Sequence, residues 1–239
     1  MSTHPVTLSV RRRGDEVVDD QPWSDVPIDL LCAAAPWRLF RWHKGQKHYS
    51  GTYWAATTCN FVIYESRLEL ARLLFADFDS TVCGIVAQPF LLKTEVEGTP
   101  RKHVPDYLLI TDAGPVVVDV KPRHRLSNPV VASTFAWTQR AVESRGWRYE
   151  VWSEPRNGVL ENIRFLAGFR RERLFDPELL DELRHADLFG MTIATASKCL
   201  PDRPEPYVRA AIHHLLWRRD LYTDLDDPLR ASAVLRRTS

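Results

Sequence analysis

The sequence predicts an α/β fold in its middle part, followed by a helical domain. Residues 65–152 have the patterns of a helix, three strands, a helix and a strand, in that order. This alternation is typical of a sheet covered by helices. Three further helical patterns follow residue 176 in a segment of different composition. We therefore expect a lead-in at 1–60, an α/β core at 61–170 and a helical domain at 171–239.

The first helix of the core is predicted by the apolar spacing in ESRLELARLLFADFD, residues 65–79. Apolar side chains recur there at steps of three and four residues, which places them on one face of a helix. They are Leu68, Ala71, Leu74, Phe75 and Phe78. The polar lead-in before this helix shows only one short strand pattern, VTLSV, and is otherwise expected to be irregular.

Three apolar runs of strand length follow the helix: VCGIVAQPFLL, VPDYLLI and PVVVDV. The TDAG between the last two runs is typical of a hairpin connection. A second helix is expected next, because Ser127 or Asn128 can cap it, Pro129 suits its first position and Gly146 can end it. WRYEVW, residues 147–152, is then expected to be the last strand of the core.

The C-terminal segment predicts three helices, in DPELLDELRHADLF, TIATASKCL and PEPYVRAAIHHLLWRRD. The final YTDLDDPLRASAVLR is expected to fold back as two short strands, which completes the layout of a winged helix. Its third helix would carry Arg209, His213, His214, Arg218 and Arg219. Residues 176–239 hold nine basic and eleven acidic residues, so protein docking is favoured over DNA binding for this domain.

The composition is that of an ordinary globular protein, with 44% hydrophobic and 26% charged residues and a net charge of +1. No apolar run approaches the roughly 18 residues of a membrane span, and no secretory signal core is apparent at the start. The four cysteines are scattered and form no CxxC pair, so free thiols are expected. We expect a bacterial cytoplasmic protein that associates with DNA and not with a membrane.

Basic residues gather in two places that suit a phosphate backbone. Residues 36–54 interleave aromatic and basic side chains without any acid, which suits either nucleic acid binding or aromatic packing with solvated basic tips. Residues 121–175 hold eleven basic residues against five acidic ones. The candidate DNA contacts are Arg41, Lys44, Lys47, Lys102, Arg123 and Arg125.

The charged residues within the third strand need a chemical explanation. Asp119 and Lys121 are two residues apart and share one face of a strand. If TDAG forms a hairpin, Asp106 comes to the same end of the strand pair. The preceding helix offers Glu69, or Glu65, as a fourth charged group. Burying such groups costs several kcal/mol unless a partner or a metal ion compensates.

Converging carboxylates repel one another and favour a hard divalent cation such as Mg²⁺, for which Mn²⁺ can substitute. Such an ion lowers the pKa of a bound water and stabilises charge on a phosphate, and a nearby lysine adds to that stabilisation. The reaction that this set predicts is hydrolysis of a phosphodiester. The alternative is a solvated salt bridge between Asp119 and Lys121 on a surface hairpin.

The pattern Pro105-Asp106, then twelve residues, then Asp119-Val120-Lys121, resembles the PD-(D/E)xK nuclease superfamily. That resemblance implies a restriction-endonuclease-like core. A narrower resemblance, to the TnsA family, covers residues 37–173. It is carried by five motifs: Glu65-Ser66-Arg67-Leu68-Glu69, Gln88-Pro89-Phe90, Pro105-Asp106-Tyr107, Asp119-Val120-Lys121-Pro122 and Glu161-Asn162-Ile163.

The TnsA resemblance implies catalytic roles for Glu69, Asp106 and Lys121, and Asp119 is a further metal ligand on the generic nuclease pattern. It also implies that the protein cuts the 5′, non-transferred strands at transposon ends beside a TnsB-type transposase, with a TnsC-type ATPase as a further partner. Two alternatives remain. One is a stand-alone restriction or repair nuclease, and the other is a catalytically silent winged-helix regulator that binds DNA or protein.

Overall fold

The computed structural model describes residues 5–14, 16–38 and 49–236. The chain is a mixed α/β protein that divides into two compact units. The first comprises residues 1–76 and 81–154, and the second comprises residues 77–80 and 155–239. The boundary expected at residue 170 thus lies inside the second unit, because the helix that follows Pro155 packs against the later helices.

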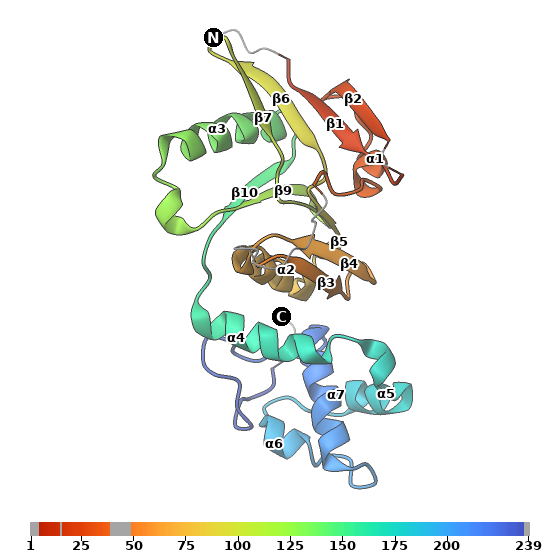
Figure 1. The fold of residues 1–239 in the computed structure, drawn as a ribbon. Coiled ribbons are helices and arrows are strands. Elements are labelled where there is room, and N and C mark those ends of the chain that lie inside the picture. Colours follow the sequence, from red (N-terminus) through yellow and green to blue (C-terminus); the bar gives the residue numbers. More distant parts are fainter. Residues whose placement is uncertain (1–4, 15, 39–48, 237–239) are drawn as a thin grey trace. The chain divides into compact units, whose positions relative to one another are not determined.

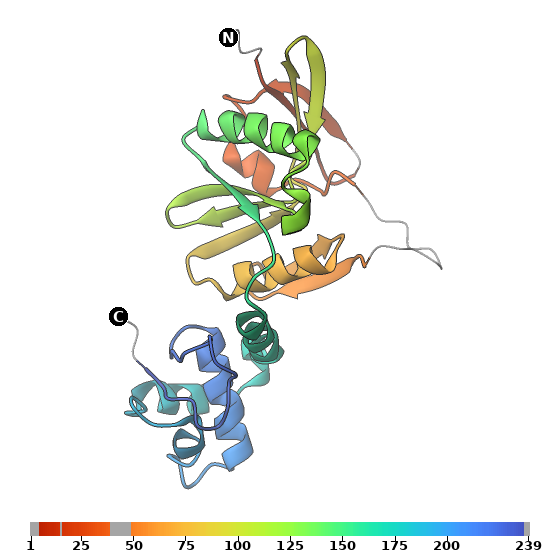
Figure 2. The same cartoon turned by 90° about the vertical axis from the view of Figure 1, so that its left-hand side faces the viewer.

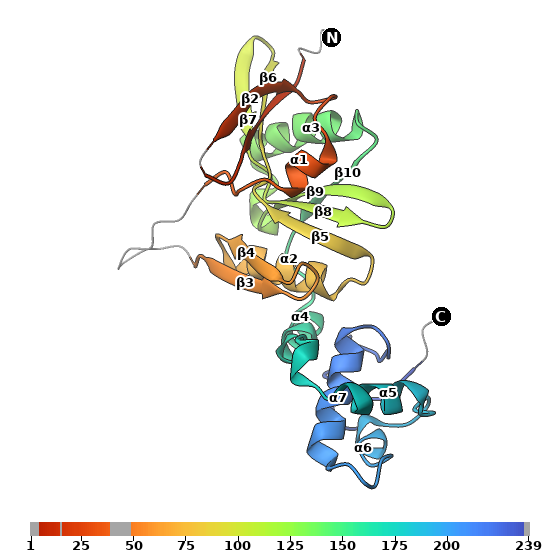
Figure 3. The ribbon, with the colours of Figure 1, turned by 90° about the vertical axis from the view of Figure 1, so that its right-hand side faces the viewer.

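The first unit is built on a four-stranded sheet of order β10-β9-β8-β5. Its strands are β5 (Val82–Ala87), β8 (Tyr107–Thr111), β9 (Gly114–Val120) and β10 (Arg148–Trp152). β10 is parallel to β9, while the other neighbours are antiparallel. Helices α2 (Arg67–Phe78) and α3 (Pro129–Glu143) lie on opposite faces of this sheet (Figure 1). The same layers are visible from either side (Figures 2 and 3).

The turns of this core form as the sequence predicts. Thr111 pairs with Gly114 across the TDAG hairpin, and Gly114 has φ of 103°, a conformation that glycine adopts without strain. The side chain of Asn128 caps α3 by accepting hydrogen bonds from the backbone N–H groups of Val130 and Val131. These features fix where β9 begins and where α3 starts.

A second sheet, of order β2-β1-β6-β7, is larger than expected. Its strands are β1 (Thr7–Arg11), β2 (Val17–Pro22), β6 (Leu91–Val96) and β7 (Thr99–His103). The expectation of an irregular lead-in was wrong, because β2 and the short helix α1 (Ile28–Cys32) lie there. The run VCGIVAQPFLL is two strands rather than one, since Gln88 has φ of 46° and Pro89 has no N–H to donate.

The core of the first unit fills the space between these two sheets and α3. Its buried members come from β1, α1, β6, β8, β9 and α3. They include Leu8, Leu31, Leu92, Val117 and Trp137. Arg145 fixes the start of the chain to the end of α3, because it donates hydrogen bonds to the carbonyl oxygens of Trp23 and Val26 and stacks on the Trp147 ring. The sheet β2-β1-β6-β7, called the N-terminal sheet below, is therefore an integral part of this unit.

A hairpin precedes α2. It consists of β3 (Gly51–Ala55) and β4 (Asn60–Tyr64), which pair with each other in a separate two-stranded sheet. β4 also contacts β5 of the central sheet. Residues 39–48, which hold much of the basic and aromatic segment, lie outside the described residues.

The second unit is helical. Its helices are α4 (Asn157–Leu166), α5 (Pro177–His185), α6 (Ile193–Ala196) and α7 (Glu205–Trp217), and three-residue 3₁₀ turns follow α4. α4, α5 and α6 all pack against α7 (Figure 1). The two expected C-terminal strands are reduced, in the described part of the chain, to isolated bridges that join Tyr222 to Arg236 and Thr192 to Val234.

α7 is buried more completely than its sequence suggests. All residues from 211 to 217 are buried, including His213 and His214. Arg219 is stacked on the Phe78 and Tyr222 rings. Of the five basic residues expected on this helix, Arg209 and Arg218 are exposed. α7 is therefore the centre of its unit rather than a helix with one free basic face.

Two further features of the described residues concern the cysteines and the helix lengths. Cys32, Cys59, Cys83 and Cys199 are all free thiols, as the spacing predicts. Among the helices of the described ranges, none is both long enough and apolar enough to cross a membrane.

Candidate active site

Asp106 lies beside the end of β9, where the hairpin register places it. Tyr107 is the register partner of Val118, so the residue before it falls opposite Asp119. The backbone N–H of Val120 donates a hydrogen bond to Oδ2 of Asp106 at 2.6 Å. The Oδ1 atom of Asp106 has no hydrogen-bond partner among the described residues. The hairpin thus brings the two aspartates of the motif together and leaves one Asp106 oxygen available.

Asp119 is 2% exposed and its carboxylate has two side-chain partners. His103, the last residue of β7, has Nε2 at 2.8 Å from Oδ1 and 2.9 Å from Oδ2 of Asp119. The hydroxyl of Tyr149 on β10 donates to Oδ2 at 2.5 Å. The rings of Phe135 and Trp137 on α3 pack around His103, each with its centroid 6.2 Å from the imidazole. Asp119 is therefore held in place by groups from β7 and β10, and rings of α3 pack on one of them.

Lys121 follows directly after β9. Its backbone N–H donates to the carbonyl oxygen of Trp152, and its own carbonyl oxygen accepts from the Ser153 hydroxyl. Its ammonium nitrogen lies 6.0 Å from the centre of the Phe135 ring, the same ring that packs on His103. Lys121 is thus on the α3 side of the sheet, as is Asp119.

Glu69 lies in the first turn of α2 and closes that end of the helix. Its Oε1 accepts from the Ser66 hydroxyl at 2.9 Å, and its Oε2 accepts from the backbone N–H of Glu65 at 2.7 Å. The Ser66 hydroxyl in turn accepts from the Glu69 backbone N–H at 3.1 Å. This is a variant of the capping box, in which Glu69 accepts from the backbone N–H of Glu65 rather than from that of Ser66. Glu69 thus has a structural role, while each of its oxygens keeps a further lone pair.

The carboxylates influence one another strongly. Burial raises the pKa of Asp106 well above its usual range, and the nearby charges of Asp119 and Glu69 raise it further, against the opposing effect of the Val120 hydrogen bond and Lys121. Burial likewise raises the pKa of Glu69, against the hydrogen bonds from the Glu65 backbone N–H and the Ser66 hydroxyl. The charge of Glu65 adds to the rise, and that of Arg38 opposes it. Glu69, Asp106 and Asp119 therefore form one electrostatic cluster.

This cluster has more negative than positive charge. Glu65, Glu69, Asp106 and Asp119 supply four negative charges when ionised, while Arg38 and Lys121 supply two positive ones. Counting these six groups alone, the sum is two net negative charges. A divalent cation would balance this excess, and oxygen ligands suit Mg²⁺ or Mn²⁺.

The donor set fits such an ion in its chemistry, although the side chains are not gathered around a common point. Within the described ranges, no group of three or more His, Cys, Asp or Glu side chains is arranged to hold a metal ion. The physical reason is that Asp119 is directed at His103 and Tyr149, while Glu69 is engaged in its cap. Each of the three carboxylates nevertheless keeps unused lone pairs.

Burial raises the pKa of two tyrosines beside the cluster, and nearby carboxylates add to the rise. Tyr107 is affected by Glu69 and Asp106, and Tyr149 by Asp119. Both hydroxyls therefore stay protonated and act as donors, Tyr107 to the carbonyl oxygen of Ile63 at 3.3 Å and Tyr149 to Asp119.

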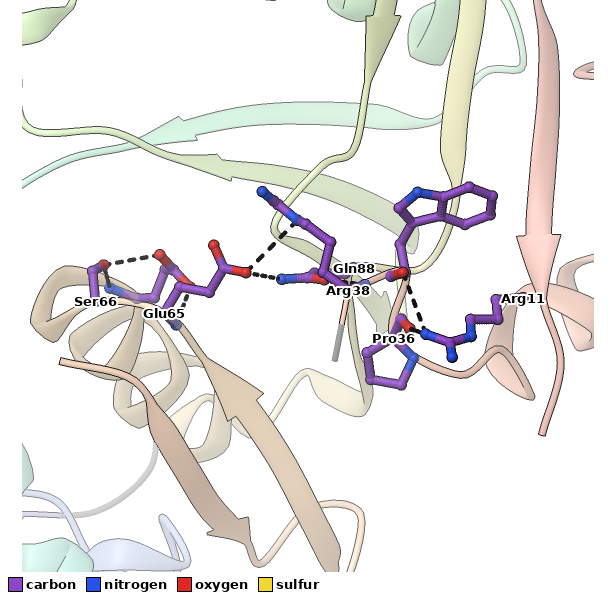
Figure 4. A network of polar contacts seen from close by, with 8 residues as sticks. Arg11, Pro36, Arg38, Glu65, Ser66 and Gln88 are labelled. Atoms are coloured by element: carbon purple, nitrogen blue, oxygen red, sulfur yellow. Dashed lines mark hydrogen bonds and ion pairs between the residues drawn. The ribbon is translucent and has the colours of Figure 1, made fainter. Parts of the chain in front are cut away.

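Gln88 connects the cluster to the segment before it in the chain. Its side-chain N–H donates to Glu65 Oε1 at 2.8 Å, and its Oε1 accepts from the backbone N–H of Arg38 at 2.8 Å. The Arg38 guanidinium lies 3.6 Å from the same Glu65 oxygen. Figure 4 shows this network, which continues through Glu69 and Ser66 at one end and reaches Arg11 at the other. Gln88 is buried, so its side-chain amide is used inside the protein.

The candidate DNA contacts are only partly described. Lys102 is exposed on β7, and Arg123 and Arg125 are exposed in the 3₁₀ turn Arg123–Arg125 that follows Lys121. Arg41, Lys44 and Lys47 lie outside the described residues. The three described candidates are therefore close in sequence to His103 or Lys121, the residues that line the site.

Three residues near the carboxylates were not singled out for the site from the sequence: His103, Tyr149 and Arg38. The structure shows the His103 imidazole in contact with Asp119. The only signal for it is its place three residues before Asp106. Asn162 of the fifth motif lies in the second unit and has a structural role, because its side chain bonds the backbone of residues 225, 227 and 229.

The chain matches no protein-family model, and no curated protein shows significant similarity to it.

Proposed function

We propose that the protein is a metal-dependent DNA endonuclease with a restriction-endonuclease-like core. The observation that supports this most is the position of Asp106, a carboxyl whose pKa is raised by burial and by the charges of Asp119 and Glu69, with Lys121 nearby. Clusters of mutually repelling carboxylates at one end of a sheet are costly, and they are typical of functional sites. A fold alone has no need of such a cluster.

Each residue has a distinct role in this proposal. Asp106, Asp119 and Glu69 hold the metal ion, Mg²⁺ or Mn²⁺, through their remaining lone pairs. The ion supplies an acidified water and charge stabilisation at the phosphate. Lys121 stabilises the negative charge that develops on the phosphate and orients the attacking water. His103 and Tyr149 fix the carboxylate of Asp119, which otherwise would be a buried charge without a partner.

The substrate in this proposal is duplex DNA. Lys102, Arg123 and Arg125 are exposed near the ends of the strands that carry His103 and Lys121. Exposed cations in such positions hold a phosphate backbone without reading its sequence. Arg41, Lys44 and Lys47 are assigned the same role from the sequence alone.

The TnsA resemblance adds the biological role. In that role the protein cuts the 5′ strands at transposon ends, together with a TnsB-type transposase and a TnsC-type ATPase, in the bacterial cytoplasm. The second unit has the element order of a winged helix. Helices α5, α6 and α7 are followed by a segment whose two ends are joined by the antiparallel bridge between Tyr222 and Arg236. Because α7 is buried from residue 211 to 217, we assign this unit to partner docking rather than to DNA reading.

A cleavage assay tests this proposal. Duplex DNA is incubated with the protein and Mg²⁺ or Mn²⁺, and the cut strand and position are mapped. We expect Asp119→Asn and Lys121→Met to lower cleavage by at least about a hundredfold, because the first removes a ligand of the metal ion and the second removes the positive charge beside the phosphate. The exposed exchange Lys198→Met, in the second unit, is the matched control. Equal cleavage by all four proteins would contradict the assigned site.

A further inference from the structure

We propose that Gln88 is a positioning residue of the nuclease centre, which fixes the Glu65–Glu69 turn relative to Asp106. This inference rests on the proposed function. Gln88 lies between β5 and β6, at the point where the chain passes from the central sheet to the N-terminal one. It contacts Asp106, Glu65 and the segment that leads to Arg38.

The backbone of Gln88 is attached on two sides. Its N–H donates to the carbonyl oxygen of Asp106 at 2.9 Å, which continues the pairing of β5 with β8 by one residue. Its carbonyl oxygen accepts from the backbone N–H of Trp37 at 3.1 Å. The position of Gln88 is thus set by Asp106 itself, and it in turn holds the segment that leads to Arg38.

The side-chain amide of Gln88 is also used in two directions. It donates to Glu65 Oε1 and accepts from the Arg38 backbone N–H, both at 2.8 Å (Figure 4). Glu65 is the residue whose backbone N–H holds Glu69 Oε2 at 2.7 Å. A continuous path of hydrogen bonds therefore runs from Asp106 through Gln88 and Glu65 to Glu69.

The conformation of Gln88 is costly. Its φ of 46° is in the left-handed region, which costs a residue other than glycine about 1–2 kcal/mol. Gln88 is also 3% exposed, so its amide must find partners inside the protein. Backbone strain of this kind persists only where many surrounding contacts hold the residue in place, and it is frequent at functional sites. A glycine or asparagine would be less strained, so the longer amide is the feature to explain.

The length of the side chain provides that explanation. Asparagine adopts the left-handed region readily but is one methylene shorter, so it cannot bridge Arg38 and Glu65 from the same backbone position. Gln88→Asn therefore keeps the turn and removes the link to Glu65. In the same way, Glu65→Gln keeps the acceptor for Gln88, whereas Glu65→Ala removes it. The Gln88→Asn variant thus separates the effect of losing the hydrogen bond from that of the backbone conformation. Comparison of Glu65→Gln with Glu65→Ala separates it from the effect of losing the charge.

The experiment measures Mn²⁺ affinity by calorimetry and the thermal unfolding temperature of the same samples. We expect Gln88→Asn and Glu65→Ala each to weaken Mn²⁺ binding about tenfold, as is usual when a group that supports a metal ligand is lost. The double variant should be no weaker than either single one, because both break the same link. Glu65→Gln should bind within about threefold of the unaltered protein, and the unfolding temperature of Gln88→Asn should not fall.

A matched control is Gln139→Asn on α3, since Gln139 makes the same amide-to-carboxylate contact, to Glu143, on an exposed surface. It should leave Mn²⁺ binding unchanged. If the unaltered protein binds Mn²⁺ and Asp106→Ala does not, but Gln88→Asn binds as the unaltered protein does, the positioning role is wrong and the nuclease centre stands. If the unaltered protein binds no Mn²⁺, both are wrong. Should Gln88→Asn fail to fold, the difference between Glu65→Ala and Glu65→Gln decides the question.

Discussion

His103 Nε2 lies within 2.9 Å of both carboxylate oxygens of Asp119. The imidazole comes from the N-terminal sheet, and the carboxylate from the central sheet. A donor placed between two carboxylate oxygens occupies a position that a cation favours. The N-terminal sheet therefore contributes directly to the candidate site, and it also keeps a buried aspartate from being without a partner.

The Tyr149 hydroxyl gives a direct test of how firmly Asp119 is held. We expect Tyr149→Phe to lower the free energy of unfolding by about 1–3 kcal/mol, since it removes a hydrogen bond to a buried charged group. Urea unfolding at pH 7 measures this change. Tyr207→Phe is the control, because Tyr207 is 69% exposed on α7 and should change stability by less than about 0.5 kcal/mol. Equal effects of the two exchanges would show that the Asp119 contact contributes nothing.

Asp106→Asn is expected to stabilise the metal-free protein. The folded-state pKa of Asp106 is raised by burial, then by Asp119 and Glu69. The contribution of this group to stability is thus complete below its unfolded-state pKa and is lost as the pH rises through the folded-state value. At pH 7 the carboxylate destabilises the fold, because a tenfold difference in proton affinity between the folded and unfolded states corresponds to about 1.4 kcal/mol.

The neutral amide removes this penalty and keeps an oxygen for the Val120 N–H. We therefore expect the metal-free Asp106→Asn protein to unfold at a higher temperature than the unaltered protein at pH 7. Mn²⁺ should raise the unfolding temperature of the unaltered protein only, because a ligand that binds the native state stabilises it. A lower unfolding temperature for Asp106→Asn without metal would contradict the claim that the Asp106 carboxylate destabilises the metal-free fold.

His213 is expected to make the second unit sensitive to mild acid. Burial lowers its pKa to about 4, with the Arg209 charge adding to the effect. Since the unfolded chain takes up the proton near pH 6.5, stability is complete above that value and is lost as the pH falls toward 4. The loss amounts to at most about 3 kcal/mol. His213→Leu should flatten the dependence of the unfolding free energy on pH across this range. An unchanged slope would show that His213 is not the cause of the acid sensitivity.

Asn162 should be the most sensitive polar residue of α4. Its side chain donates to the carbonyl oxygens of Leu225 and Asp227 and accepts from the Leu229 N–H, with 6% exposure. Asn162→Ala leaves these backbone groups without partners, so we expect a loss of about 2–4 kcal/mol in unfolding free energy. Asn157→Ala, at the first residue of the same helix, serves as the control. Mn²⁺ affinity should be unchanged in Asn162→Ala that remains folded.

The central hairpin and α3 were predictable because local chemistry determines them. TDAG specifies the turn, and Asn128 with Pro129 specifies the start of the helix. β7 was not predictable, because TPRKH has no apolar alternation and is a strand only through its pairing with β6. His103 was missed as an Asp119 partner for the same reason. The burial of Gln88 was not predicted because it depends on segments distant in sequence.

The candidate site followed from strand periodicity, which put Asp119 and Lys121 on one face and brought Asp106 beside them. The periodicity did not reveal that Glu69 would also cap its own helix, although Ser66 and Glu69 have the spacing of a capping box. The basic residues of α7 were misplaced because helical spacing does not reveal how many neighbours a helix has. Residues 211 to 217 are buried all round.

The central proposal is that these carboxylates form a divalent metal site. It is tested most directly by calorimetric titration of Mn²⁺ into the protein with a short DNA duplex present, compared with Asp106→Ala and Asp119→Ala. This measurement does not need a transposase partner, whereas cleavage can depend on one. We predict that the unaltered protein binds Mn²⁺ and that both substitutions abolish binding. Absence of binding by the unaltered protein, or equal binding by all three, would contradict the metal site and favour a DNA- or protein-binding regulator.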